Sequence, residues 1–403
     1  MQIRRLLART LRVALDGGPA HAQLIQRWAQ AQAAEASWLA ALTWDGVGAA
    51  AGWALRALDL GGVAPPEVDA AASEAYEEAR QISLVQVADL TRLGVELASV
   101  QIPCIALKGS ALLVGNLCPA LGIRWMADVD VLVREQQVED AAWVLESLGF
   151  ARGVTRDLSV PEFSRPYHDT FTSVDGRSIE LHWRVGPARW GKAAAADRWF
   201  ERATPSSADG ILLPSALDLF WHFLVHDARN HAWSSGSLRA ALDLALVARA
   251  PGFTLVDVMR RLDEDPRPGP LLEAIADAAT LSPILAAEIE PSADPRYLRL
   301  ARWRDGIGRR SWKLQRRSEA IAWGVTLDRA RRFGGWGTVA DHALRAVPEP
   351  TPRRSPGALL RRWFLTLRHV AFVGALAASH LISVSGGVTG RRALPSPAPP
   401  GTR

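Results

Sequence analysis

The segment MADVDVLV, from Met126 to Val133, alternates acidic or small residues with aliphatic ones. Alternation with a period of two is typical of a β-strand whose two faces differ, because successive side chains point to opposite faces. Val129 and Val131 are then expected to face a core, and Asp128 and Asp130 to share the other face, about 7 Å apart at Cα. Two carboxylates held side by side are costly unless a cation lies between them. The segment therefore predicts a sheet that carries a cation site on one face.

The segments around this strand predict a small mixed α/β domain over residues 101–185. IPCIALKGS is typical of a short buried strand that enters a tight turn, ALLVGNL of a short helix, and EQQVEDAAWVLESLGF of an amphipathic helix ended by Gly149. YHDTFTSV and RSIELHWRV are two alternating runs joined by Asp175-Gly176, which is a strong hairpin signal. The order strand, helix, strand, helix, hairpin predicts a mixed sheet.

Helical patterns flank this domain on both sides, so the predicted fold class is α+β. Residues 1–100 form helical patterns, the first of them an expected amphipathic helix of a cytoplasmic protein, because Arg9 and Arg12 interrupt the apolar run that a signal peptide needs. Residues 186–347 predict a helical domain that includes ALDLFWHFLVHDA and LRAALDLALVARA. Residues 348–403 predict a Pro/Arg-rich linker, one apolar helix with a basic flank, and a disordered tail.

Charge is distributed unevenly along the chain. The net charge is +5, yet from Arg296 onwards there are 21 Lys and Arg residues against 5 Asp and Glu residues. A basic segment of this kind favours an anionic partner or a membrane surface, and a solvated arginine-rich surface is the alternative. The apolar run over residues 370–382 is too short to span a bilayer. No sequence-specific DNA binding is expected, because no motif for it is present.

A third carboxylate, Glu180, lies in the second strand of the predicted hairpin. It is flanked by Ile179 and Leu181 in the same apolar-acidic-apolar alternation. A carboxylate on a neighbouring strand would complete a site for two hard divalent cations, Mg²⁺ or Mn²⁺. Glu180 is preferred to Asp175, which is a turn residue, and to Asp169, which lies outside the motif.

The turn Lys108-Gly109-Ser110 predicts a place for an anion. Free backbone N–H groups at a helix start and the Ser110 hydroxyl can hold a phosphate, and Gly109 allows the backbone to approach it closely. Lys108 and Arg124 add positive charge. The alternatives are a solvent-facing Lys108 and an Arg124 that pairs with a catalytic aspartate.

Taken together, these motifs resemble those of the polymerase-β-like nucleotidyltransferases, which combine a Gly-Ser turn, an Asp-x-Asp strand and a third acidic residue on a later strand. They resemble more closely a bacterial family of uncharacterised nucleotidyltransferases. The matching motifs are Leu107-Lys108-Gly109, Arg124, Asp128 with Asp130, Leu148-Gly149-Phe150 and Glu180-Leu181-His182-Trp183.

The resemblance implies an enzyme with a small mixed-sheet nucleotidyltransferase domain. It would move a nucleoside monophosphate from an NTP to an acceptor hydroxyl of a small molecule, peptide or protein, and release pyrophosphate. The implied metal ligands and catalytic residues are Asp128, Asp130 and Glu180, and the implied nucleotide-binding residues are Lys108, Gly109, Ser110 and Arg124.

The sequence leaves alternative functions and several residue roles open. A catalytically degenerate module that holds a nucleotide or a partner is the alternative function, and a membrane-surface adaptor acting through the last helix is a second. The acceptor and the NTP are not specified by the sequence. His226 and Asp243 match the helical part of the resembling family, and it stays open whether they and His182 act in the site.

Overall fold

The protein is described here from a computed structural model. The structure describes residues 2–20, 22–30, 42, 47–153, 167–186, 196–230, 238–265 and 269–289. The basic segment from Arg296 onwards, with its predicted linker, last helix and tail, lies outside the described residues.

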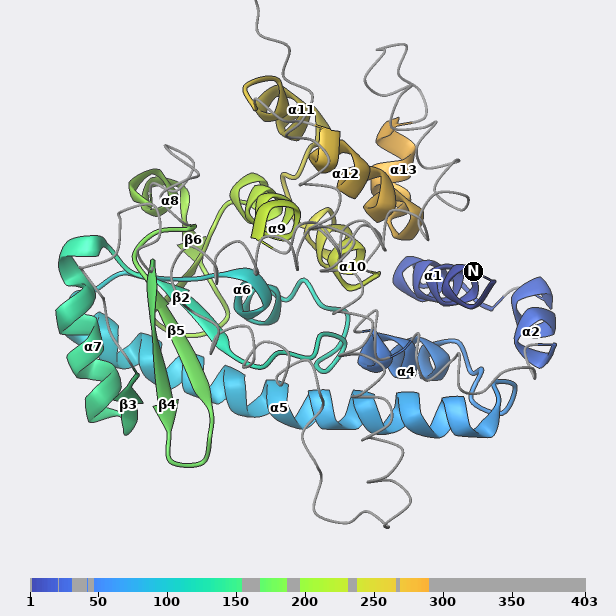
Figure 1. Ribbon diagram of the computed structural model, residues 1–403, viewed down its shortest axis with the longest axis horizontal. Helices are drawn as coiled ribbons and strands as arrows, with labels where there is room; N and C mark the ends of the chain where they lie inside the picture. Colours follow the sequence, from blue (N-terminus) through green and yellow to red (C-terminus); the bar gives the residue numbers. More distant parts are fainter. Residues whose placement is uncertain are drawn as a thin grey trace, which may run out of the picture. The chain divides into compact units, whose positions relative to one another are not determined.

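A seven-stranded mixed sheet forms the centre of the described part of the chain, with the strand order β3-β4-β5-β2-β1-β7-β6 (Figure 1). Its strands are β1 (Cys104–Ala106), β2 (Val129–Leu132), β3 (Phe150–Arg152), β4 (His168–Ser173), β5 (Ser178–His182), β6 (Thr204–Pro205) and β7 (Ile211–Leu213). Strand β2 lies parallel to β5 and antiparallel to β1, and β1 lies parallel to β7. The sheet is therefore mixed, as the sequence predicts.

Helices precede and follow the sheet, which confirms the predicted α+β class. They are α1 (Gln2–Asp16), α2 (Ala22–Ala29), α4 (Gly48–Ala57), α5 (Pro66–Ser99), α6 (Lys108–Val114), the 3₁₀ turn η1 (Glu135–Gln137), α7 (Val138–Ser147), α8 (Asp197–Arg202), α9 (Ala216–Asn230), α10 (Leu238–Val247), α11 (Leu255–Asp263), α12 (Gly269–Leu281) and α13 (Pro283–Ile289). Helix α5, in light blue in Figure 1, starts at Pro66, whose fixed φ suits a first helical position, and runs along the sheet and α4. Within the described residues, no helix has the length and apolarity needed to cross a membrane.

The sheet is longer than the sequence predicts. Strand β3 follows Gly149 directly and pairs with β4, and strands β6 and β7 extend the sheet beyond residue 185. The sequence predicts only a helical domain over residues 186–347, where β6 and β7 lie. These strands have two or three residues each, too few for an alternating pattern to be visible.

The two faces of the sheet differ in chemistry. Ala106, Val131 and Leu181 lie on one face, are fully buried, and belong to the main hydrophobic core. The other face carries Asp130 and Glu180. Beside them lies a smaller apolar cluster of Ile105, Leu107, Leu132, Val185, Ala196 and Trp199. The predicted alternation of strand β2 is therefore confirmed, and it separates a core face from a polar face.

The β4–β5 hairpin turns at Asp175-Gly176, as predicted, but its loop has one more residue than a two-residue turn. The Ser173 N–H donates to the Arg177 carbonyl and the Gly176 N–H to the Ser173 carbonyl, so Val174, Asp175 and Gly176 form the loop. Gly176 has a φ of +84°, a conformation that glycine adopts without strain. This loop length fixes the register of the hairpin, which decides the residues that meet in the site.

Candidate active site

Asp130 and Glu180 lie directly opposite each other on the parallel strands β2 and β5. Residues paired in this way point to the same face of a sheet. Asp130 is almost fully buried, with 4% of its surface exposed, and the Glu180 side chain is 19% exposed. Two carboxylates from different strands are thus held at one partly buried position, as the sequence predicts for a cation site.

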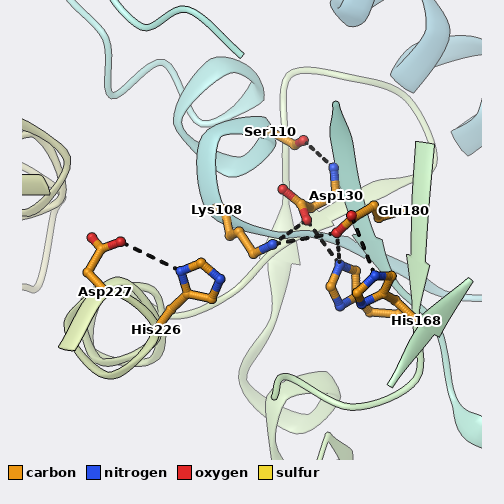
Figure 2. A network of polar contacts seen from close by, with 8 residues as sticks. Lys108, Ser110, Asp130, His168, Glu180, His226 and Asp227 are labelled. Carbon is orange, nitrogen blue, oxygen red and sulfur yellow. Dashed lines mark hydrogen bonds and ion pairs between the residues drawn. The ribbon is translucent and has the colours of Figure 1, made fainter. Parts of the chain in front are cut away.

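Lys108, the first residue of α6, lies between these carboxylates. Its Nζ is 2.6 Å from Oδ1 of Asp130 and 3.7 Å from Oε2 of Glu180 (Figure 2). Burial opposes the charge on Lys108, but the two carboxylates outweigh it and raise the pKa of the ammonium above its usual value. The backbone of Lys108 has a φ of +46°, a left-handed conformation that costs a non-glycine residue about 1–2 kcal/mol. The strained backbone of this turn directs the charged Lys108 side chain towards Asp130.

Two histidines complete this cluster. Nε2 of the fully buried His182 lies 3.0 Å from Oδ1 of Asp130 and 3.3 Å from Oε2 of Glu180. Nε2 of His168, from β4, lies 3.5 Å from Oε1 of Glu180 (Figure 2). Burial lowers the pKa of His168 to about 4, with His182 as the next cause. Burial also opposes protonation of His182, but its hydrogen bonds with Asp130 and Glu180 raise its pKa overall.

His168 is not among the site residues that the sequence predicts. In the hairpin, His168 pairs with His182 and Thr170 with Glu180, so His168 shares the polar face. A two-residue turn at Asp175-Gly176 would instead place Asp169 opposite His182. His168 could therefore have been predicted only from the length of the hairpin loop, and the residue types in the loop do not specify that length.

Asp128 lies just before β2, at the edge of this cluster. Burial, followed by the charges of Asp130 and Glu180, raises its pKa to about 6. Among the described residues, no hydrogen bond or ion pair satisfies its carboxylate. Its charge is thus the least compensated of the three predicted metal ligands.

Gly109 and Ser110 have structural neighbours that the sequence did not reveal. A Cβ on Gly109 would lie 2.0 Å from Sδ of Met126, so a larger residue here would force the Met126 side chain to move. Ser110 is fully buried, and its Oγ accepts a hydrogen bond of 2.9 Å from the backbone N–H of Asp130 (Figure 2). Both residues position the loop and strand that carry the aspartates.

Arg124 lies on the loop before Asp128 and forms an ion pair with Asp243 of α10. Its Nε is 2.8 Å and 3.1 Å from the two carboxylate oxygens of Asp243, and its Nη1 donates to the Trp125 carbonyl. Asp243 is 2% exposed. Arg124 is also close enough to Asp128 to oppose the rise in its pKa. The alternative considered from the sequence, a pair with a catalytic aspartate, is not the pair that forms.

The other carboxylates weighed from the sequence lie apart from the cluster. Asp169 is buried on the opposite face of β4, where Arg152 holds it through a 2.6 Å ion pair. Asp175, in the hairpin turn, bonds Arg177. His226, on α9, is 3.6 Å from its neighbour Asp227 and lies on the Lys108 side of the cluster in Figure 2.

An α+β fold that brings carboxylates from two parallel strands to one lysine is suited to the transfer of phosphate groups with divalent cations. The family model described as "Uncharacterised nucleotidyltransferase" matches residues 32–265, more than half of the chain. The chain therefore belongs to this family of nucleotidyltransferases, and it is a transferase. A search of curated proteins found no match.

Proposed function

We propose that this protein transfers a nucleoside monophosphate from an NTP to an acceptor hydroxyl. The acceptor oxygen forms a bond to the α-phosphorus, and the bond from that phosphorus to the oxygen bridging the α- and β-phosphates breaks. Pyrophosphate leaves with the electron pair of the broken bond, and the acceptor hydroxyl gives up its proton. The observation that carries the proposal is the pairing of Asp130 with Glu180 on adjacent parallel strands, next to the uncompensated Asp128.

The donor set fits Mg²⁺ or Mn²⁺. Asp128, Asp130 and Glu180 offer carboxylate oxygens, which these cations prefer, and the raised pKa of Asp128 indicates that a positive charge would be favourable there. When bound, such cations neutralise phosphate charge and polarise the reacting oxygens. In this proposal the three carboxylates are the metal ligands and catalytic residues.

The nucleotide phosphates are assigned to the basic side of the cluster. Lys108 supplies a positive charge beside the carboxylates, and the predicted binding residues Gly109 and Ser110 stand next to it at the start of α6. Arg124 uses Nε and Nη1 on protein groups, which leaves Nη2 to contact a phosphate. Fixed positive groups of this kind stabilise the charge that develops on a leaving pyrophosphate.

Glu180 is assigned to the acceptor. Hydrogen bonding to His182 keeps the pKa of Glu180 lowered despite its burial, so the carboxylate is ionised at neutral pH and can accept the hydroxyl proton. His182 and His168 hold both of its oxygens in place. The acceptor class, a small molecule, peptide or protein, is the part of the reaction that this site leaves open.

One observation favours a second function. The Lys108 ammonium already neutralises Asp130 and Glu180, as a metal ion would. A catalytically degenerate module could therefore hold a nucleotide without metal. This alternative predicts nucleotide binding that does not depend on a divalent cation.

Calorimetric titration of each NTP into the purified protein tests the proposal. With Mg²⁺ present, we expect binding of at least one NTP, and with EDTA we expect none, because clustered carboxylates repel a bare triphosphate. Asp175→Asn, in the exposed hairpin turn, is the control and should bind like the wild type. Equal affinity in EDTA would favour the degenerate module instead.

A further inference from the structure

The cluster contains a set of donors that differs from the carboxylates assigned to Mg²⁺. One ring nitrogen of His168, one carboxylate oxygen of Glu180 and one ring nitrogen of His182 lie within 4.8 Å of one another. Nε2 of His182 is 3.3 Å from Oε2 of Glu180, and Nε2 of His168 is 3.5 Å from Oε1 of the same carboxylate. Ligand atoms around one ion at 2.0–2.2 Å are separated by about 3.0–3.5 Å, so each nitrogen-to-oxygen contact has this spacing, and a small movement of the side chains would bring the whole set onto one cation.

The chemistry of this set is not that of a magnesium site. Two of its three donors are imidazole nitrogens, and imidazole suits Zn²⁺ and other late transition metals, whereas carboxylates and water suit Mg²⁺ and Mn²⁺. Three protein ligands also leave coordination positions open, as in catalytic metal sites. His182 is fully buried and its Nε2 faces the carboxylates, so it is fixed in position before any ion binds.

We propose that His168, Glu180 and His182 form a binding site for a divalent transition metal that takes Zn²⁺ in preference to Mn²⁺ and discriminates against Mg²⁺. In the absence of nucleotide, Mg²⁺ would then be left the oxygen donors of Asp128 and Asp130. This inference rests on the proposed function in one respect, which is that Glu180 is a metal ligand. It concerns the binding of a metal ion in the absence of nucleotide.

Two observations give the site its place in the cluster. Lys108 is nearer to Asp130 than to Glu180, at 2.6 Å against 3.7 Å, so an ion between the histidines and Glu180 leaves the lysine on Asp130. The rings of His168 and His182 lie 4.8 Å apart between centroids, and their Nε2 atoms contact Oε1 and Oε2 of Glu180 respectively. The hairpin β4–β5 thus supplies all three ligands from one local structure.

Metal titration of the full chain, stripped of metal and without nucleotide, tests this inference. Free Mn²⁺ is followed by its paramagnetic resonance signal, and Mg²⁺ or Zn²⁺ is added as a competitor. We expect Zn²⁺ to displace one bound Mn²⁺, and a hundredfold excess of Mg²⁺ to leave it bound. Displacement of all Mn²⁺ by Mg²⁺ at comparable concentration would overturn the inference.

Two variants of His168 identify the ligands. His168→Ala removes one nitrogen from a partly exposed position, and we expect it to weaken Mn²⁺ binding at this site by at least about tenfold. His168→Asp replaces the nitrogen with oxygen and should narrow the preference for Mn²⁺ over Mg²⁺. Asp175→Asn, in the turn of the same hairpin, is the matched control and should keep wild-type affinity.

The outcomes separate this inference from the proposed function. If His168→Ala binds Mn²⁺ as the wild type does, while NTP binding still requires Mg²⁺, the transition-metal site is wrong and the proposed function stands. If the wild type shows the expected metal selectivity but binds no NTP, the metal site stands and the proposed function is wrong.

Discussion

Nζ of Lys108 lies 2.6 Å from Oδ1 of Asp130, at the centre of the carboxylate cluster. The pair joins the start of α6 to strand β2 and places a fixed positive charge where a divalent cation would be attracted. Lys108 therefore competes with a metal ion for the same carboxylates, and it also offers a charge to a phosphate.

Replacement of Lys108 by methionine should separate these two effects. Lys108→Met removes the competing charge, so we expect tighter binding of Mn²⁺ without nucleotide, by about tenfold at the distances found here. The same change should weaken binding of the NTP with metal, because the phosphates lose a partner. Calorimetry of both titrations measures the two affinities, and unchanged Mn²⁺ affinity would show that Lys108 does not compete with the metal.

Asp128, just before β2, and Asp130, within β2, should respond differently to the same substitution. Asp128→Asn removes a charge without a described partner, so in EDTA we expect a gain in the free energy of unfolding of about 1 kcal/mol. Asp130→Asn breaks buried contacts with Lys108 and His182 and should lose about 3 kcal/mol. Both should abolish transfer activity. Denaturant titrations in EDTA measure the difference, and an equal gain in both variants would contradict it.

The Arg124–Asp243 pair should be a structural requirement as well as a source of charge. Asp243→Asn leaves a largely buried guanidinium without its counter-charge, and we expect a loss of about 3 kcal/mol in stability. The double variant Arg124→Met with Asp243→Leu should recover most of that loss. If Arg124 also contacts phosphate, the double variant will still bind NTP weakly, and wild-type NTP affinity in it would remove Arg124 from the nucleotide site.

His222 on α9 predicts a pH dependence of stability. Burial, followed by the charges of His226, Lys108 and His182, lowers the pKa of His222 well below its ordinary value of 6.5. The unfolded chain therefore takes up a proton below pH 6.5 that the folded protein does not. Stability is fully present above this pH and falls below it, by up to about 1.4 kcal/mol per pH unit. Denaturation of the wild type and His222→Phe between pH 7.5 and about 5 should show a shallower slope in the variant, and parallel slopes would exclude His222 as the cause.

The sequence predicted the elements whose patterns are local. The alternation around Asp128 and Asp130 identified strand β2 and its polar face, and Asp175-Gly176 identified the hairpin. Strand β7 was missed because its partner β1 is far away in the chain, and three residues carry no period. Local patterns report local structure, and the pairing of distant segments depends on packing that they do not encode.

The site residues divide in the same way, into those that local patterns predict and those whose partners lie far away in the chain. The alternation placed Asp130 and Glu180 on polar strand faces, and their direct pairing across β2 and β5 comes from the structure. The partner of Arg124 could not, because Asp243 lies 119 residues further along the chain, on a helix of the flanking domain. Gly109 and Ser110 matched a phosphate-binding turn, yet Met126 and the Asp130 amide are the neighbours that the structure gives them. A short motif specifies residue types, but the same residue types are compatible with several packing arrangements.

The most direct test of nucleotidyl transfer is to determine which phosphorus of the NTP reaches the acceptor. NTP labelled at the α- or the γ-phosphate is incubated with the wild type, Mg²⁺ or Mn²⁺, and candidate small-molecule, peptide and protein acceptors. We expect the α-label to join an acceptor and the γ-label to be released as pyrophosphate. Asp128→Asn and Asp130→Asn should abolish both, and Asp175→Asn should preserve both. Transfer of the γ-label to the acceptor, or equal transfer by wild type and Asp130→Asn, would contradict the proposed function.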